Sequence, residues 1–570
     1  MTGMVLLLLL GYWPLPANSG ISGTFMEYRN QHLHAGFDLS TNGKVGFPVH
    51  CFDDGKIVML KVQKRGYGRV LYIRHPKQKL VSVYGHLDRF TPRLEKIVSR
   101  YIKLRHSRYP GTIVPRKPIP VQKGQVIAYS GESGVGWPHL HFELRNLQNE
   151  PVNPKDFGLS VNQDKSAPEF QFLNIYPETP SSTVNGHCRF VQLPLTHSKD
   201  GNFTVKPFRV SGRVLMSVTI RDTDGRKGPL AIQRIITRLN HHPFYDYQAQ
   251  VFSFDRFNRS SAVYDLTQTR LSPSTYGFNL FRIPGSDLQC QKQYPTTLQK
   301  GQNLMQVSAI DFAGHKVELN FRFHWQEPSA QPVIPTTLTT ASVQLHGQIL
   351  PAASIHQPIS IPIAGTDWTV MSYGVTPSAI RLGNVAIETK GYNTSPRLMY
   401  ARFVSKLPEE PGLSIVPDTG LEIQPGQLFL SQLNLVMYWK VADIRMGWFR
   451  YDSVKKKWKY RDTELNYITQ NATADDFRNG MYAVFLDTAS PVIHSKPYYF
   501  RNRTAWRVTD VGKGVDDSTI MLSRGKKTWK MEYDPDRKIA WIDRHLKKGR
   551  YKIRVTDIAG NTSSAIGRLH

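Results

Sequence analysis

The chain has 570 residues, which is too long for a single hydrophobic core and predicts about three or four domains. Hydrophobic residues make up 40% and charged residues 21% of the sequence, a balance that excludes extensive disorder. The formal net charge of +29 predicts attraction to polyanions, such as nucleic acid or an anionic cell envelope. The sequence contains no common nucleic-acid-binding motif, and we therefore expect no nucleic-acid partner.

An apolar run at residues 4–10 stands near the start of the chain and is too short to cross a bilayer. Small residues follow at Ala17 and Ser19, where a signal peptidase could cut. We predict a signal peptide over residues 1–19, although no Lys or Arg precedes the apolar run, and an extracytoplasmic location in the periplasm or cell envelope. A short hydrophobic first strand is the alternative. No other segment predicts a transmembrane span.

Residues 20–160 consist of short β-branched and aromatic runs separated by turn residues, which predicts a domain of antiparallel β-sheet. The segment 89–120 interrupts this rhythm with a possible short helix around residues 94–104, followed by a proline-rich strand. We expect it to be an insertion that flanks the functional site or forms a plain surface loop.

Four polar side chains in this domain have the spacing of a metal site. Positions i, i+2 and i+4 of a strand share one face, so His34 and Asp38 point the same way, with Gly36 between them. His139 and His141 share a face by the same rule. Two imidazoles and one carboxylate suit Zn²⁺ and leave a fourth tetrahedral position for water, as in a catalytic site. His-x-His pairs also arise by chance among 19 histidines, so this prediction depends on the two motifs occurring together in one domain.

These motifs belong to a longer pattern that resembles the M23 family of zinc metallopeptidases, of the lysostaphin and LytM type. The matching phrases lie, in chain order, at residues 34–38, 54–58, 66–68, 84–87, 121–127 and 136–143. The resemblance covers about residues 22–158, roughly a quarter of the chain. The domain would then be an antiparallel β-sheet peptidase domain that hydrolyses peptide bonds of bacterial peptidoglycan.

The resemblance also implies a role for five side chains. His34, Asp38 and His141 would hold one Zn²⁺ ion per chain, and His86 and His139 would be the two catalytic histidines. The ion would activate water and polarise the scissile carbonyl, while the histidines orient the water, shuttle its proton and stabilise the oxyanion.

Two further residues carry expectations of their own. Glu143 is expected to point away from the metal or to make an outer hydrogen bond to a ligand. Met26 stands where close relatives usually have Gly and could narrow or re-aim the entrance of the groove without touching a ligand.

The resemblance leaves two other functions open. Some relatives have lost zinc ligands and act as non-catalytic regulators of cell-wall amidases, but here the ligand set is complete. The chain could also be an envelope adhesion or scaffold protein, because most of it lies outside the peptidase-like domain.

The rest of the chain contains a faint internal repeat. Residues 164–168 resemble residues 487–491, and each opens a segment that closes on a similar phrase, at residues 311–315 and 557–561. We predict immunoglobulin-like β-sandwich regions at 164–326 and 487–570, joined through a Pro/Thr-rich linker at 327–341 and a β-rich domain at 342–486.

Basic clusters at residues 455–459, 526–530 and 547–550 are interleaved with Trp458 and Trp529. We interpret them as solvated strand faces with an aromatic residue in the core, rather than as stacking platforms for nucleic acid. They fit a partner such as peptidoglycan or another cell-envelope polyanion.

The three cysteines form no CxxC motif, so a thiolate zinc site is not expected. Cys188 and Cys290 either pair in an oxidising compartment or remain buried thiols, and Cys51 is left without a partner. The sequence predicts no particular oligomeric state.

Overall fold

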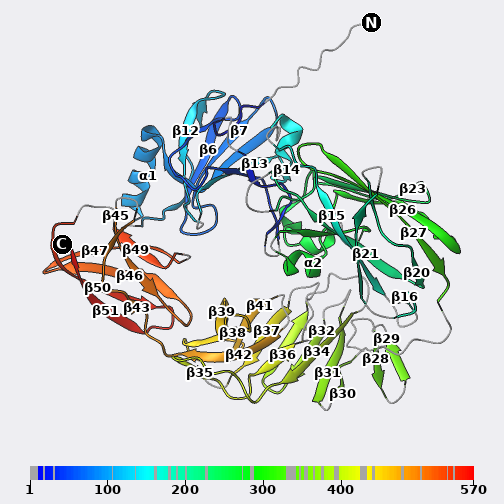
Figure 1. Cartoon of the computed structure of the whole chain (residues 1–570). Coiled ribbons are helices and arrows are strands. Elements are labelled where there is room, and N and C mark those ends of the chain that lie inside the picture. The colour runs from blue at the N-terminus through cyan, green and yellow to red at the C-terminus, as the bar shows by residue number, and fades with distance from the viewer. Residues whose placement is uncertain are drawn as a thin grey trace, which may run out of the picture. The chain divides into compact units, whose positions relative to one another are not determined.

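The computed structural model describes residues 11–569 with short gaps, and the chain is built almost entirely of β-strands (Figure 1). The residues outside the description, besides 1–10 and 570, are 17–19, 30–31, 106, 135–136, 160–163, 178–181, 188–189, 199–201, 225–228, 273, 283–287, 329–341, 346–347, 352–356, 364–365, 374–377, 390–396, 424–432, 440–442, 477–479, 501–502, 536 and 543–545. Most strand pairs are antiparallel, which confirms the predicted fold class. The chain divides into two compact units, Met1–Thr337 and Leu338–His570.

Several predictions fall on residues outside the description. Most of the expected signal peptide and of the linker 327–341 lies there, as does Cys188. Cys51 and Cys290 are buried free thiols. Within the part of the chain that the structure covers, no helix has the length and apolar character needed to span a membrane.

The peptidase-like domain is organised around one large sheet. Its strands follow the order β1 (Ile21–Gly23), β4 (Phe37–Ser40), β13 (His139–Arg145), β8 (Leu80–Gly85), β7 (Arg69–His75), β6 (Gly55–Val62) and β10 (Gly111–Ile113), with β11 (Ile119–Val121) also on β6 and β14 (Pro151–Val152) on β13. Two smaller sheets consist of β5 (Pro48–His50), β12 (Val126–Ser130) and β9 (Leu87–Phe90), and of β2 (Tyr28–Arg29) and β3 (His32–Leu33). Strand β13 thus lies between β4 and β8.

The alternation of side chains along β13 separates the core from the functional face. Leu140, Phe142 and Leu144 are fully buried in the apolar core of the domain. His139, His141 and Glu143 alternate with them and therefore share the opposite face of the strand.

The insertion contains the expected helix, α1 (Pro92–Leu104). Proline in the first turn suits a helix start, and Leu94 and Val98 form its buried side. Strands β10 and β11 of the insertion both pair with β6, which is separated from β13 by β8 and β7. They therefore extend the far edge of the sheet instead of lying beside β4 and β13.

Region 164–326 forms two further sheets in the same compact unit. One consists of β17 (Val191–Pro194), β15 (Glu169–Pro177), β21 (Val214–Arg221) and β24 (Tyr276–Asn279). The other consists of β16 (Thr183–Val184), β20 (Phe208–Ser211), β27 (Lys316–Gln326), β26 (Gly301–Ile310), β22 (Arg234–Leu239), β23 (His242–Gln248) and β25 (Gln291–Gln293), with β18 (Thr196–His197) and β19 (Phe203–Thr204). Between β23 and β24 the chain forms short helices η2 (Phe254–Arg256), η3 (Ser260–Ala262) and α2 (Leu266–Leu271).

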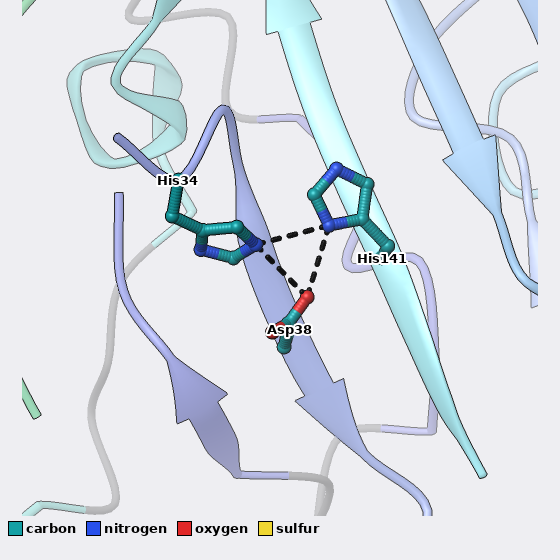
Figure 2. A group of neighbouring side chains, drawn as sticks. All are labelled: His34, Asp38 and His141. Carbon is teal, nitrogen blue, oxygen red and sulfur yellow. Dashed lines mark hydrogen bonds and ion pairs between the residues drawn. The ribbon is translucent and has the colours of Figure 1, made fainter. Parts of the chain in front are cut away.

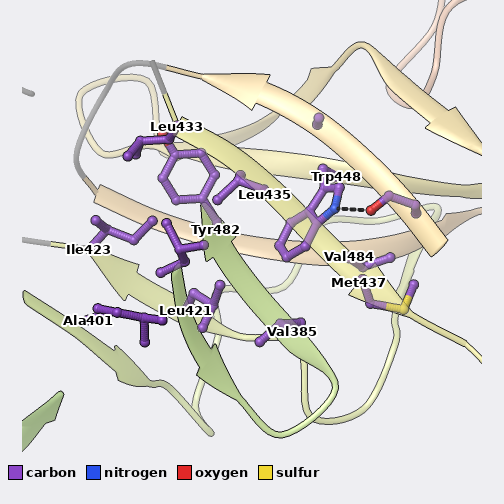
Figure 3. Close-up of a cluster of buried hydrophobic side chains, with 14 of the residues drawn as sticks. Val385, Ala401, Leu421, Ile423, Leu433, Leu435, Met437, Trp448, Tyr482 and Val484 are labelled. Carbon is purple, nitrogen blue, oxygen red and sulfur yellow. Dashed lines mark hydrogen bonds between the residues drawn. The ribbon is translucent and has the colours of Figure 1, made fainter. Parts of the chain in front are cut away.

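The second unit begins with two packed sheets and a separate hairpin of β28 (Ser342–Leu345) and β29 (Gln348–Pro351). The larger sheet contains β30 (Ile359–Ile363), β31 (Thr366–Tyr373), β34 (Arg397–Phe403), β36 (Leu421–Ile423), β42 (Gly480–Asp487), β38 (Met446–Asp452) and β39 (Lys457–Arg461), with β35 (Leu413–Ile415) on β42. The smaller contains β32 (Ser378–Leu382), β33 (Val385–Thr389), β37 (Leu433–Tyr438), β41 (Asn471–Asp476) and β40 (Thr463–Asn466). Trp448 and Tyr482 lie in the core between them (Figure 3).

The last region has its own core around Trp506. Its sheets are β43 (Val492–Ile493), β45 (Arg503–Thr509), β49 (Ile539–Ile542) and β48 (Glu532–Asp534), with β44 (Tyr498–Phe500) on β45, and β47 (Lys527–Lys530), β46 (Val515–Arg524), β50 (Gly549–Asp557) and β51 (Thr562–Leu569).

The basic cluster at 455–459 has the predicted arrangement. Trp458 packs in a core cluster with Phe449 and Phe485, and its indole N–H donates a hydrogen bond to the carbonyl of Pro408. The lysines around it are exposed. The indole of Trp458 is therefore not available for stacking.

Candidate active site

The three predicted metal ligands meet at one point (Figure 2). Strands β4 and β13 pair Asp38 with His141, and His34 approaches from the segment just before β4. His34 Nε2 lies 3.0 Å from Asp38 Oδ1 and 3.0 Å from His141 Nδ1, and the last two atoms are 2.9 Å apart. All three side chains are buried.

Hydrogen bonds on the outer side of each imidazole direct a lone pair into this cluster. His34 Nδ1 lies 2.7 Å from the Thr24 carbonyl, so this nitrogen donates and Nε2 carries the lone pair. His141 Nε2 lies 2.8 Å from Glu143 Oε1, so in the neutral ring it donates and Nδ1 carries the lone pair. Two nitrogens and one carboxylate oxygen therefore face a common point, a donor set that fits tetrahedral Zn²⁺ with one position left for water.

Glu143 makes the outer hydrogen bond that was expected for it. Burial raises the pKa of Glu143, but Arg145 and His141 outweigh burial and lower it to about 2. Arg145 Nε donates to Glu143 Oε2 at 2.6 Å, and the Tyr67 hydroxyl donates to Oε1. Burial lowers the pKa of His141, but hydrogen bonds with Asp38 and Glu143 raise it to about 9. The two carboxylates, Asp38 and Glu143, therefore favour a positive charge at the position of His141.

The second carboxylate oxygen of Asp38, Oδ2, also accepts a hydrogen bond. Arg29 donates to Asp38 Oδ2 at 2.7 Å and pairs with Glu27 Oε1 at 2.6 Å. A Cβ on Gly23 would lie 2.0 Å from the Arg29 guanidinium, so a larger residue would force the end of the Arg29 side chain to move. Although burial raises the pKa of Asp38, His34 and His139 hold it well below its usual value.

The two predicted catalytic histidines lie beside this cluster. The rings of His86 and His139 are 4.6 Å apart, and His139 Nε2 is 3.5 Å from Asp38 Oδ1. His86 occupies the turn between β8 and β9 with a φ of 58°, and its Nδ1 lies 3.0 Å from the carbonyl of Ser133. His139 Nδ1 lies 2.8 Å from the carbonyl of Trp137. Both rings therefore donate through Nδ1 and leave the lone pair on Nε2.

Both histidines are uncharged near neutral pH. Burial, followed by the nearby His139 and His141, holds the pKa of His86 well below its usual value, and burial also lowers the pKa of His139. A neutral imidazole with a free lone pair can accept a proton, as a general base requires.

Met26 behaves differently from the expectation. Its φ of 59° lies in the left-handed region that favours glycine. The prediction that Met26 narrows the groove entrance is wrong, because its side chain is completely buried. Its backbone N–H donates to the carbonyl of His34 at 2.8 Å, so the residue contacts a ligand through the main chain.

Sequence reasoning did not single out Arg29, Tyr67 or Arg145 as parts of the site. Arg145 follows His141 and Glu143 at a spacing of two along β13, so strand periodicity could have found it. Tyr67 lies in a phrase that the family pattern already included. No local signal places Arg29 against Asp38, because their contact is made through space across a hairpin.

Comparison with known proteins finds similarity over a limited part of the chain. The murein hydrolase activator NlpD of Escherichia coli is 28% identical over 142 residues, which are 25% of this chain and 30% of NlpD. The chain thus matches about a third of the length of this curated relative. No protein-family model matches.

Three solved structures are each similar to about a quarter of the chain. Helicobacter pylori Csd3 is 28% identical with a TM-score of 0.19, covering 26% of this chain and 33% of Csd3. The catalytic domain of the M23 protein EnpA from Enterococcus faecalis is 19% identical with a TM-score of 0.19, covering 26% and 95%. The catalytic domain of lysostaphin from Staphylococcus simulans is 22% identical with a TM-score of 0.18, covering 25% and 90%. The similarity to NlpD extends over about a quarter of this chain.

Proposed function

We propose that residues 20–160 are a zinc-dependent endopeptidase that cleaves peptide bonds of bacterial peptidoglycan. The observation that carries the proposal is the convergence of His34 Nε2, Asp38 Oδ1 and His141 Nδ1, with the outer nitrogen of each imidazole already occupied. A bound zinc ion would supply Lewis-acid chemistry, polarising the scissile carbonyl and lowering the pKa of water.

The remaining side chains supply proton transfer and orientation. His139 Nε2, near Asp38, and the unprotonated Nε2 of His86 can each accept a proton from the attacking water. After protonation, the same N–H groups can donate to the developing oxyanion and to the leaving amine. Glu143 keeps the His141 ring oriented throughout.

A second candidate function is supported by the similarity to NlpD, whose name describes a murein hydrolase activator. In that case the domain would bind a hydrolase partner and would itself cut nothing. The presence of three metal ligands together with both histidines favours the enzyme, because an activator has no need for a proton-accepting pair.

We also propose an extracytoplasmic location in the periplasm or cell envelope, with peptidoglycan or another envelope polyanion as the partner. The net charge of +29 and the similarity to a murein-related protein support this assignment.

The test combines zinc content with cleavage products. Purified full-length protein should release new muropeptides from isolated peptidoglycan, detected by mass spectrometry, and a chelator should abolish the release. His141→Ala should lose both zinc and cleavage, whereas His86→Ala should keep zinc and lose cleavage by a factor of about 10² or more. His242→Ala, at an exposed position in β23, is the matched control. Full cleavage by His141→Ala and His86→Ala, or no cleavage by the zinc-loaded wild type, would reject the enzyme.

A further inference from the structure

The segment that carries His34 is held from outside the peptidase-like domain. We call residues 24–34, between β1 and β4, the ligand loop. Hydrogen bonds from described residues of region 164–326, in the same compact unit, reach this loop. They join Ala231 N–H to Thr24 Oγ1 at 3.1 Å, the Tyr264 hydroxyl to the Met26 carbonyl at 2.9 Å, and Leu33 N–H to the Phe257 carbonyl at 2.9 Å.

Two of these contacts reach the residues that hold His34. The Thr24 carbonyl accepts the hydrogen bond from His34 Nδ1, and the Met26 N–H donates to the His34 carbonyl. The Thr24 hydroxyl also donates to Glu27 Oε2, and Glu27 pairs with the Arg29 that bonds Asp38. Movement of Thr24 or Met26 would therefore displace both the imidazole and the backbone of His34.

Aromatic packing reinforces the same contact. Phe257 stacks on His32 with ring centroids 4.4 Å apart, Phe252 packs on Phe25 at 5.7 Å, and Tyr264 lies 6.0 Å from Tyr28. Tyr264 is completely buried. Rings in such contact resist sliding, because their burial and edge interactions would both be lost.

We propose that residues 231–264 belong to the zinc site. They position His34 and thereby set the zinc affinity. Tyr264 and Thr24 are positioning residues in this scheme. The inference rests on the proposed function for the identity of the metal ion. It implies that region 164–326 does more than direct a separate catalytic domain to its substrate, because the ligand loop makes its full set of contacts only with this region in place.

The physical reason lies in the buried carbonyl of Met26. Without the Tyr264 hydroxyl this carbonyl has lost its partner, and a buried unsatisfied acceptor drives the local backbone toward water. The loop would relax, and His34 Nε2 would leave the point where the other two donors meet. Loss of such an outer contact typically weakens metal binding by about 10- to 100-fold.

The experiment measures the zinc dissociation constant of the full-length chain by competition with a fluorescent chelator. Tyr264→Phe, which removes only the hydroxyl, should bind zinc roughly tenfold more weakly than wild type. The control is Tyr247→Phe, since Tyr247 is a buried tyrosine of β23 whose hydroxyl has no hydrogen-bond partner among the described residues. It should retain the wild-type affinity within about twofold.

A second pair of variants tests the other contact without disturbing the aromatic packing. Thr24→Val removes the hydroxyl and should weaken zinc binding, whereas Thr24→Ser keeps it and should restore the affinity. Wild-type affinity in both Tyr264→Phe and Thr24→Val would overturn the inference. A wild-type chain that binds zinc but leaves peptidoglycan uncut would instead reject the proposed peptidase, while the affinity differences would still stand.

Discussion

At the scale of single residues, the site depends on groups that do not themselves face the metal position. Glu143 is buried, receives hydrogen bonds from His141, Arg145 and Tyr67, and is held ionised by the first two. Its negative charge increases the basicity of the His141 ring, which strengthens His141 as a metal ligand. A neutral side chain of the same shape would keep the geometry and remove this effect.

We therefore expect Glu143→Gln to weaken zinc binding roughly tenfold. It should also lower the free energy of unfolding of the metal-free chain by about 3 kcal/mol or more, because Arg145 would lose its buried ionic partner. Chelator competition and chemical unfolding would measure the two effects. Glu150→Gln, which alters a carboxylate bonded to Asn146 in the turn after β13, should change neither.

The shared face of His139 and His141 could be predicted from the sequence because strand periodicity is local. The spacing of two places His139 and His141 on one face of β13, whereas His34 lies outside β4 and strand periodicity does not set its approach to Asp38. The family resemblance then predicts that His34, Asp38 and His141 hold one ion. The contact between Arg29 and Asp38 could not be predicted in this way, because it depends on how a hairpin folds back over β1 and β4.

At the scale of elements, the sequence predicted the antiparallel sheet correctly, but it did not predict which edge of the sheet the insertion joins. Its helix was expected near residues 94–104 and is present at Pro92–Leu104. That its strands join the β6 edge depends on nonlocal pairing, about which the spacing of apolar residues says nothing.

Acidic side chains lie close together in region 164–326, where Asp222 and Asp311 follow β21 and β26 and Asp164 precedes β15. Asp222 follows β21, is buried, and has a pKa raised to about 8 by burial, by Asp311 and by Asp164. Between pH 3.8 and 8 the folded chain therefore binds more protons at this group than the unfolded chain. Stability then falls as the pH rises through this window.

Asp222→Asn removes this dependence because the amide stays neutral at every pH. The variant should match wild type near pH 4 and exceed it by roughly 2 kcal/mol or more at pH 8, given about 1.4 kcal/mol per pKa unit. Thermal unfolding at the two pH values would measure the difference. The exposed control Asp418→Asn should behave like wild type at both. An equal gain for Asp222→Asn at pH 4 would show that its effect is not electrostatic.

At the scale of the whole molecule, the peptidase-like domain and region 164–326 act as one compact unit, and the second unit has separate cores. The sequence predicted several β regions, because repeats and turn residues mark them locally. It could not predict that residues 231–264 contact the ligand loop, because the two segments lie about 200 residues apart. The immunoglobulin-like character of the later regions remains a prediction.

The net charge of +29 belongs to the whole chain, and we expect it to control attachment to the wall rather than catalysis. The screening length falls from about 10 Å at 0.1 M salt to about 3 Å at 1 M. Binding of the full chain to isolated cell wall should therefore drop at least about tenfold between 0.05 and 0.5 M NaCl, as sedimentation assays would show.

Cleavage of a short uncharged peptide should change little over the same range, because the buried donor atoms of the site lie about 3 Å apart, well inside any screening length. Changing Lys455, Lys456 and Lys457 together to Gln removes three exposed charges from a turn and strand edge of the second unit. This triple variant should bind wall more weakly at low salt and equally at high salt, with peptide cleavage unchanged. Salt-independent wall binding would mean that shape and hydrogen bonds, rather than charge, attach the chain.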